Sequence, residues 1–323
     1  MKNRTLVMMS AIVALFSGCS LSLFPGEAPL KEKTLQGTGE DKILVVSIDR
    51  LISDRPDEKL LRSEPSMVQE VVSHLRQAQK DSHVKALLLK INSPGGTVTA
   101  SDILYHEIKE FKERAQAKVV VSMMDVAASG GYYVSLPADY ILAHPTTVTG
   151  SIGVIFAYPG IRGLMDKVGL AMHVNTSGEL KDMGSPFRPP TLEEQAIFQQ
   201  LTDNLADRFL ELVVENRHLT PEQIKLIASA RVFLAPEAKE IGLVDQIGYL
   251  DDAIAKAKEL AALPENARII VYRHGDIEND TIYNMTFQQG SGNHGALLPP
   301  LLSAWSGVAE SGFYYLWPAV TGQ

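Results

Sequence analysis

The chain has 323 residues, of which 45% are apolar and 21% charged, and a formal net charge of −8. This length is enough for one large domain or two small ones with a buried core. The negative charge, and the lack of a basic run with interleaved aromatic residues, argue against a nucleic-acid partner.

The first residues have the pattern of an export signal. Lys2 and Arg4 precede an apolar run at 6–16, and small residues then lead to Cys19, the only cysteine. The sequence LFSGC at 15–19 resembles the bacterial lipobox, in which the signal is cleaved and the cysteine lipidated. We therefore expect a signal peptide at 1–18 and a lipoprotein in the bacterial envelope, anchored in the membrane through Cys19 and facing the periplasm or cell exterior. An uncleaved anchor helix, or a plain signal with a chance cysteine, is the alternative.

Strands and helices are expected to alternate after a polar linker. Residues 19–41 are rich in Gly, Pro, Lys and Glu without an apolar period, which predicts a tether. From Lys42 onward the pattern becomes regular. Strands are expected at 43–48, 86–91, 118–123, 140–143 and 152–155, with amphipathic helices around 68–78 and 103–111. This alternation predicts an α/β fold of repeated βαβ units with right-handed crossovers and a largely parallel sheet.

The second half is expected to be more helical. Thr191 and Glu194 form a capping box before a long helix that reaches Leu212, and a short helix follows Thr220. A strand is expected at 269–271. The tail at 274–323 carries aromatic residues but is too interrupted for a membrane span, so we expect it to pack on the domain, a neighbour or the membrane surface.

Two glycine-rich turns follow the second and third predicted strands. The first contains Gly95 and Gly96, and the second contains Ser129 and Gly130. Both fall at the carboxyl ends of strands, where parallel sheets place their sites. A serine at a strand-to-helix turn can present its Oγ, and the glycines free N–H groups to stabilise an oxyanion. The two turns predict acyl transfer by a serine, provided that a base is present.

Three residues are candidates for that base. His144 lies at a strand exit, and His173 lies inside a predicted strand at 170–174. Histidine is the usual partner of a serine, but neither residue lies in a motif typical of catalysis. Lys181 lies in a glycine-bounded segment, and a lysine acts as a base only where burial and neighbouring groups bring its pKa toward neutrality. Taken alone, Lys181 has the features of a solvated surface lysine.

Four motifs in series resemble those of one known family. They are Ile91–Gly96, Ala128–Tyr133, Thr149–Val154 and Lys181–Arg188. The set resembles the bacterial SppA-type signal peptide peptidases, which are serine proteases with a Ser/Lys dyad. The similarity covers 42–273, and its single copy of the protease unit is typical of the short form. It implies a protease domain at 42–273 with a crotonase-like, Clp-protease-like fold.

The resemblance also implies roles for individual residues. Ser129 corresponds to the nucleophile, Lys181 to the general base, and Ser151 to the serine that orients the lysine amine. The implied oxyanion hole uses the N–H groups of Gly95 or Gly96 together with Gly130. No metal or cofactor is expected. Family members form rings or domes with active sites built across subunit contacts. We therefore expect a homo-oligomer whose substrates are peptides, namely signal-peptide remnants or unfolded segments.

Other functions are compatible with parts of the pattern. A crotonase-class lyase or hydratase acting on an acyl-CoA shares the fold, but CoA is cytoplasmic whereas an export signal is expected in this chain. A non-catalytic lipoprotein scaffold would not need the serine, the lysine and both glycine turns. A stomatin-associated protease usually carries further membrane segments. A Clp-like Ser-His-Asp triad would need a histidine near position 154, which is Val154.

Overall fold

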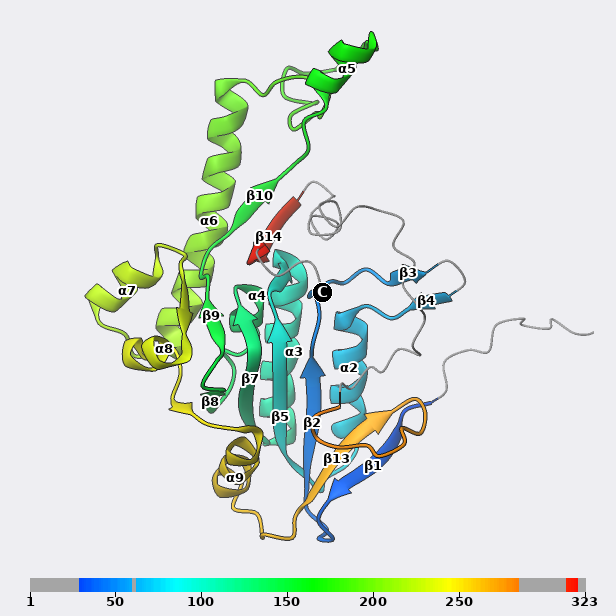
Figure 1. Cartoon of the computed structure of the whole chain (residues 1–323), viewed down its shortest axis with the longest axis vertical. Helices are drawn as coiled ribbons and strands as arrows, with labels where there is room; N and C mark the ends of the chain where they lie inside the picture. The colour runs from blue at the N-terminus through cyan, green and yellow to red at the C-terminus, as the bar shows by residue number, and fades with distance from the viewer. Residues whose placement is uncertain (1–28, 60–61, 285–311, 319–323) are drawn as a thin grey trace, which may run out of the picture.

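A largely parallel sheet forms the centre of the molecule (Figure 1), a computed structural model that describes residues 29–59, 62–284 and 312–318. The strand order is β1-β13-β2-β5-β7-β8-β12. All neighbours in this order are parallel except β1 and β13. The strands are β1 (Lys31–Gln36), β13 (Arg268–Arg273), β2 (Lys42–Ile48), β5 (Val84–Ser93), β7 (Lys118–Ala128), β8 (Tyr140–Ala143) and β12 (Gln246–Ile247).

Shorter strands surround the end of β7. β9 (Val148–Gly150) pairs with β7 and with β11 (Val232–Leu234). A second sheet has the order β10-β14-β6 and consists of β10 (Ile155–Ala157), β14 (Gly312–Leu316) and β6 (Gly95–Thr97). A two-stranded ribbon joins β3 (Asp57–Lys59) to β4 (Arg62–Glu64). The carboxyl ends of β5 and β7 thus meet a small sheet built from distant parts of the chain.

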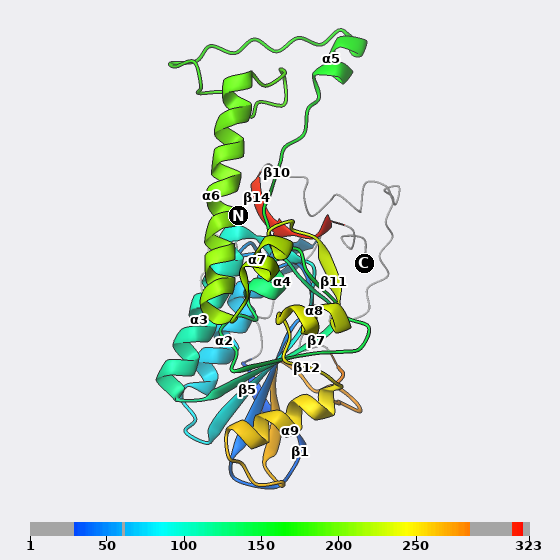
Figure 2. The ribbon, with the colours of Figure 1, turned by 90° about the vertical axis from the view of Figure 1, so that its left-hand side faces the viewer.

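Helices cover both faces of the main sheet (Figure 2). On one face lie α2 (Met67–Ala78), α3 (Val98–Ala115) and the second half of α6 (Leu192–Asn216), and on the other lies α9 (Leu250–Leu260). The remaining helices are α4 (Gly130–Tyr133), α5 (Arg162–Val168), α7 (Pro221–Ile227) and α8 (Ala235–Ile241). Alternate side chains of β5 enter the two cores, Leu87 and Leu89 on one side and Leu88 on the other. Two buried faces explain why the strands are continuous apolar runs.

The predicted α/β architecture is confirmed, but three local expectations are wrong. The range predicted as a tether contains β1, an edge strand whose mostly exposed side chains leave no apolar period. Residues 152–155 are not one strand, because Ser151 to Val154 separate β9 from β10. Residues 170–174 form no strand and are exposed, although the run is apolar. The strand was predicted because apolar residues are usually buried, but within the described part of one copy these residues remain exposed.

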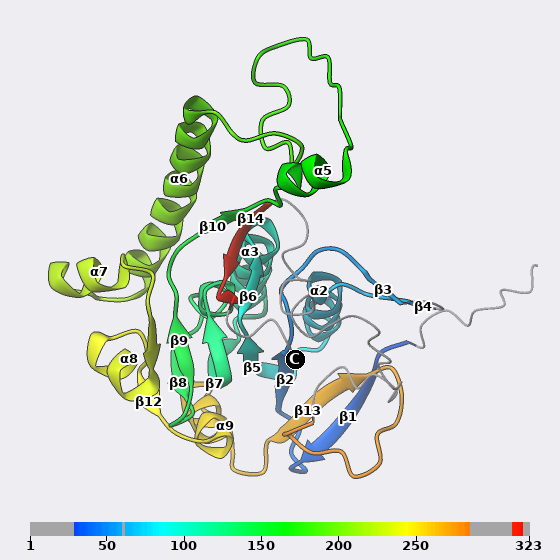
Figure 3. The ribbon, with the colours of Figure 1, turned by 45° about the horizontal axis from the view of Figure 1, so that its top comes forward.

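Residues 158–190, here called the arm, stand out from the body together with the start of α6 (Figures 1 and 3). The arm contains α5 and irregular chain. Its exposed large apolar side chains include Leu164, Val168, Leu170, Met172 and Val174, which are 48–67% exposed. At its base the N–H of Ile161 donates to the carbonyl of Pro186 at 2.8 Å. The two ends of the arm are therefore linked by a hydrogen bond at its base, and the rest of the arm exposes apolar side chains.

The predicted signal peptide and Cys19 lie outside the described residues, as does most of the tail. Within 29–59, 62–284 and 312–318, no helix has the length and apolarity needed to cross a membrane. The tail was expected to pack on the domain, a neighbour or the membrane surface. Its strand β14 packs on the domain, because it pairs with β6 and β10.

Candidate active site

Ser129 lies where β7 ends and α4 begins. Its backbone has φ 52° and ψ −116°, a conformation that L-residues rarely adopt. The N–H of Ser129 donates to the carbonyl of Gly150 at 2.8 Å, and its carbonyl accepts from the N–H of Tyr133 at 2.9 Å. The side chain is 1% exposed, and its Oγ has no hydrogen-bond partner. A strained turn that holds a buried, unpartnered hydroxyl is typical of a nucleophile.

The two glycine turns contact each other beside Ser129. A Cβ on Gly95 would lie 2.7 Å from the backbone nitrogen of Gly130, and a Cβ on Gly130 would lie 3.1 Å from the nitrogen of Gly96. Gly95 also has φ 106°, so only glycine fits this approach without strain. Its own N–H donates to the Oγ of Ser93 at 3.2 Å. We call this contact between the two turns the glycine junction.

Ser151 is also close to Ser129. β9 pairs with β7 so that Gly150 lies opposite Ala128, which places the next residue of each strand side by side. Ser151 has φ 52° and is 9% exposed, and its N–H donates to the carbonyl of Arg231 at 2.9 Å. The structure therefore brings together every predicted site residue of the body.

Lys181 is the predicted site residue that one copy does not bring to the glycine junction. It is exposed and lies in the arm between α5 and α6, which Figure 3 shows apart from the sheet ends. Its backbone N–H donates to the carbonyl of Gly178 at 3.1 Å. The resemblance implied active sites built across subunit contacts, but the sequence did not predict which site residue would lie apart from Ser129 in one copy.

Arg188 holds the chain around Lys181 to the start of α6. Its Nε donates to Asp182 at 2.8 Å, and its Nη1 donates to Glu194 at 2.9 Å. These hydrogen bonds lower the pKa of both carboxyl groups below their usual range. Glu194 also accepts from the N–H of Thr191 in the predicted capping box. The segment that carries Lys181 thus has an ordered base.

The two candidate histidines lie away from the glycine junction. Ala143 pairs with Met123, so His144 is level with Met124 of β7. Met124 lies five residues before Ser129, which is about 16 Å along a strand. Its Nδ1 lies 2.8 Å from the Oγ of Thr146. His173 is exposed in the arm. Neither histidine is placed to take a proton from Ser129 within one copy.

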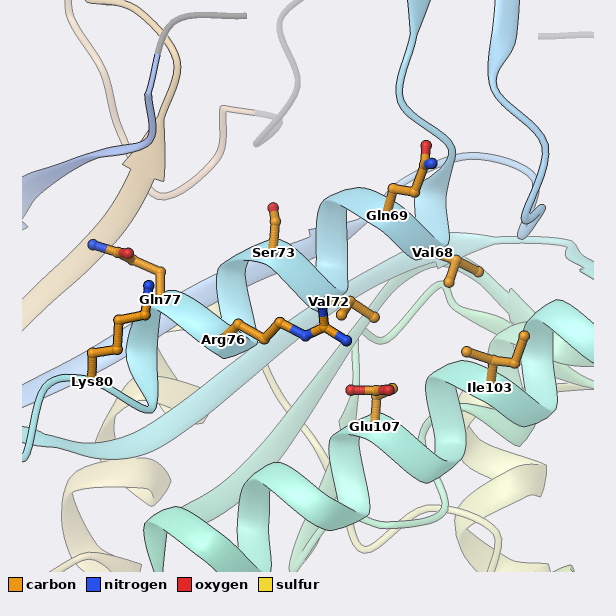
Figure 4. A pocket seen from close by; sticks show the side chains of 9 residues that line it. All are labelled: Val68, Gln69, Val72, Ser73, Arg76, Gln77, Lys80, Ile103 and Glu107. Carbon is orange, nitrogen blue, oxygen red and sulfur yellow. The ribbon is translucent and has the colours of Figure 1, made fainter.

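Two hollows on the described surface are lined by residues other than Ser129. One of about 550 Å³ lies between α2 and α3 and is lined by apolar Val72 and Ile103 and by the charged side chains of Arg76 and Glu107 (Figure 4). A second of about 550 Å³ lies near Pro56 and His274. Within the described residues no group of three or more His, Cys, Asp or Glu side chains is arranged to hold a metal ion. The glycine junction is the candidate active site because the buried Ser129 lies beside it with a hydroxyl that has no partner.

Two family profiles match overlapping parts of the chain, and known proteins are similar to most of it. The profile of peptidase family S49 matches residues 111–264, and that of Clp protease matches residues 51–147. A protein of Enterococcus faecium, provisionally named signal peptide peptidase SppA, is 34% identical over 282 residues, 83% of this chain and 81% of that protein. Protease 4 of Salmonella typhi is 39% identical over 235 residues, 72% of this chain and 36% of that protein.

Among solved structures, a ClpP1 mutant from Listeria monocytogenes is similar to this chain. It has 20% sequence identity and a TM-score of 0.43, over 65% of this chain and 94% of that chain. The Clp protease profile and the parallel sheet confirm the predicted α/β fold of the Clp-protease and crotonase type.

Proposed function

This chain belongs to peptidase family S49 and is a serine protease, and we propose that it cleaves peptides with a dyad of Ser129 and Lys181. The observation that carries the proposal is the glycine junction beside a buried Ser129 whose Oγ has no partner. A serine held in this way needs only a base within reach.

The proposed reaction follows from the groups at the junction. A neutral amine of Lys181 takes the proton of the Ser129 hydroxyl, and the Oγ attacks the peptide carbonyl carbon. The oxyanion accepts hydrogen bonds from N–H groups of the glycine turns. The lysine returns the proton to the departing amine, and water then hydrolyses the ester.

Gly96 and Gly130 are the proposed oxyanion donors. The N–H of Gly95 already donates to the Oγ of Ser93. This favours the N–H of Gly96 over that of Gly95 as the donor in the oxyanion hole. The nitrogens of Gly96 and Gly130 both lie close to the contact between the two turns. Loss of one such donor typically costs about 3 kcal/mol of transition-state stabilisation.

We further propose that Lys181 acts on Ser129 of a neighbouring copy in a homo-oligomeric ring or dome. Within one copy the arm leaves Lys181 exposed and apart from the junction. The arm also exposes apolar side chains that a neighbour would bury, for example Leu164 at 64% and Val168 at 67%. Ser151 is the proposed residue that orients the incoming amine.

The proposed substrates are signal-peptide remnants and other unfolded or membrane-derived peptides outside the cytoplasm. The name of the Enterococcus faecium relative supports this class, and the predicted export signal supports the location. An enclosed assembly would admit extended chains and exclude folded proteins.

The test is hydrolysis of casein and of a fluorogenic peptide by the full chain and three variants. Ser129→Ala and Lys181→Ala are expected to lose at least about a thousandfold in kcat/KM. Lys167→Ala removes another exposed lysine of the arm and should retain full activity. Co-assembly of the two inactive variants should restore part of the activity, because some sites then combine an intact serine with an intact lysine.

Each part of the proposal has its own contrary result. Full activity of Lys181→Ala would refute the dyad. Mixed assemblies that stay inactive would refute a dyad shared between copies. Activity in Ser129→Ala would refute the nucleophile.

A further inference from the structure

Ser93 joins the first glycine turn to the neighbouring strand. It is the last residue of β5 and is fully buried. β5 lies beside β2 with Ile91 opposite Ile48, so Arg50, two residues beyond Ile48, is level with Ser93 (Figure 1). The hydroxyl of Ser93 donates to the carbonyl of Arg50 at 2.7 Å and accepts from the N–H of Gly95 at 3.2 Å. One side chain thus links the end of β2 to the turn that enters the glycine junction.

The peptide group between Gly95 and Gly96 has a fixed direction. Ile52 forms a parallel bridge with Gly96, in which its N–H donates to the carbonyl of Gly95 at 2.9 Å and its carbonyl accepts from the N–H of Thr97 at 3.0 Å. The carbonyl and the N–H of one trans peptide group point in opposite directions. The N–H of Gly96 therefore points away from Ile52. A Cβ on Gly130 would lie 3.1 Å from the nitrogen of Gly96, which places this N–H at the glycine junction.

Gly95 needs to be held on both sides to keep this direction. Its φ of 106° lies in a region that glycine enters and leaves at little cost. Ile52 holds its carbonyl, and Ser93 holds its N–H. Without the hydroxyl of Ser93, this buried N–H would lose its acceptor, and rotation of the turn would be the way to find another. Such a rotation would carry the N–H of Gly96 away from the junction.

A hydroxyl suits position 93 because it donates and accepts at the same time, which alanine cannot do. The carbonyl of Gly95 lies 3.4 Å from the Oγ of Ser93, farther than that of Arg50, so Arg50 is the better acceptor. Arg50 is itself held to the start of α2. Its Nη2 donates to Glu70 at 2.6 Å and to the carbonyl of Pro65 at 2.9 Å. The anchor of Ser93 is therefore fixed to the body.

From these contacts we infer that Ser93 is a positioning residue of the protease, whose hydroxyl fixes the first glycine turn so that the N–H of Gly96 stabilises the oxyanion. Ser93 acts through Gly95 and not on the substrate. The inference rests on the proposed place of the oxyanion hole. Because the oxyanion forms only in the transition state, Ser93 contributes to kcat more than to substrate binding.

The first experiment compares the kinetics of the full chain with those of Ser93→Ala, Ser93→Cys and a control. Ser93→Ala should lower kcat about tenfold to a hundredfold and change KM less than about twofold. Ser93→Cys should fall between the two, because a thiol is a weak donor and acceptor. The control is Ser135→Ala, which should retain most of kcat. Ser135 is equally buried and lies beyond the end of α4, where its Oγ donates to the carbonyl of Tyr132 at 2.5 Å.

The pH dependence of kcat/KM distinguishes the oxyanion hole from the base. It should keep its shape in Ser93→Ala, because the substitution leaves Lys181 and its surroundings unchanged. A shifted profile would mean that Ser93 acts on the base, which would overturn the inference.

The second experiment separates the oxyanion from the shape of the cleft. A peptide aldehyde and the matching peptide alcohol are titrated as inhibitors of the wild type and of Ser93→Ala. The Oγ of Ser129 adds to the aldehyde carbon, its proton passes to Lys181, and the aldehyde oxygen becomes an oxyanion. The alcohol has no carbonyl and forms no such adduct. The inhibition constant of the aldehyde should rise about tenfold or more, and that of the alcohol should stay the same.

Inhibition constants do not depend on the fraction of enzyme that is folded, so a loss of stability in Ser93→Ala cannot produce this difference. If Ser93→Ala fails to fold, Ser93→Cys carries the same comparison. Full kcat in Ser93→Ala, or an equal loss of affinity for aldehyde and alcohol, would overturn the inference and leave the proposed function standing. Activity in Ser129→Ala would overturn the proposed function instead.

Discussion

Ser129 shows how one residue is held in an unfavourable backbone conformation. A non-glycine residue in such a region costs on the order of 1–3 kcal/mol and persists only where its surroundings impose it. Here the hydrogen bonds to Gly150 and Tyr133 fix the peptide groups on both sides. The strain places the Oγ at the glycine junction, where no other group satisfies it.

Replacement of Ser129 by glycine should therefore stabilise the protein relative to replacement by alanine. Glycine relieves the strain and loses about 0.5–1 kcal/mol through the greater freedom of the unfolded chain. We expect Ser129→Gly to exceed Ser129→Ala by about 1 kcal/mol in free energy of unfolding, with both variants inactive. Urea titrations of the two variants measure this difference. Equal stabilities would show that the turn carries no such strain.

The serine and its glycines could be predicted from the sequence because their chemistry is local. Small residues after a buried apolar run identify both turns. The choice between Gly95 and Gly96 could not be predicted, because it depends on a hydrogen bond from Gly95 to Ser93 that the turn forms only when folded. The role of Lys181 stays a prediction that one copy of the chain does not test.

At the scale of the elements, ion pairs hold the end of the arm to the start of α6. Arg188 bridges Asp182, next to Lys181, and Glu194, which is 1% exposed. Planar guanidinium groups can bridge two carboxylates in a way that a lysine ammonium cannot. The contacts couple the lysine segment to the first turn of α6.

Loss of Arg188 should loosen the arm without unfolding the body. We expect Arg188→Ala to speed hydrogen exchange of the amides in 178–190 and to lower kcat/KM by about tenfold, since a 1 Å misplacement of a catalytic group costs up to about a hundredfold. Arg162→Ala is the matched control, because the ion pair of Arg162 with Asp166 is exposed and contributes little. Unchanged exchange in Arg188→Ala would show that another contact orders the segment.

Elements that pair locally could be predicted, and those that pair at long range could not. The βαβ units follow from apolar periods and connections between successive strands. β14 pairs with β6, which lies more than half the chain earlier in the sequence. The apolar pattern of the tail is too interrupted to predict that pairing or its register. The arm segment 170–174 misled for the opposite reason, because its apolar residues are not buried within one copy.

At the scale of the whole molecule, stability should depend on pH through a buried histidine. His74 is fully buried on α2, with its ring edge-on to Tyr272 at 5.9 Å. Burial, and the positive charges of His274 and Arg273, lower the pKa of His74 to about 3. In the unfolded chain the same group has a pKa of about 6.5. Below that pH the unfolded state binds a proton that the folded state does not.

The free energy of unfolding should therefore fall as the pH drops from about 6.5 toward 3. Urea unfolding at pH 7.5 and pH 5 measures this fall. Buried Lys90, whose pKa is lowered to about 8, and Asp49, whose pKa is raised by burial, also contribute near these pH values, so the contribution of His74 is taken from a comparison with a His74 variant. His74→Leu should show a smaller loss of stability between these two pH values than the wild type. Identical losses would mean that His74 does not titrate on unfolding in this range.

The separation of Lys181 from Ser129 makes the proposed enzyme sensitive to its own abundance. On the proposed arrangement, a newly made single copy holds a nucleophile without a base and a base without a nucleophile. Proteolysis then begins only once copies accumulate and close into an assembly. The local concentration of the chain would act as the switch that a removable propeptide provides in other proteases.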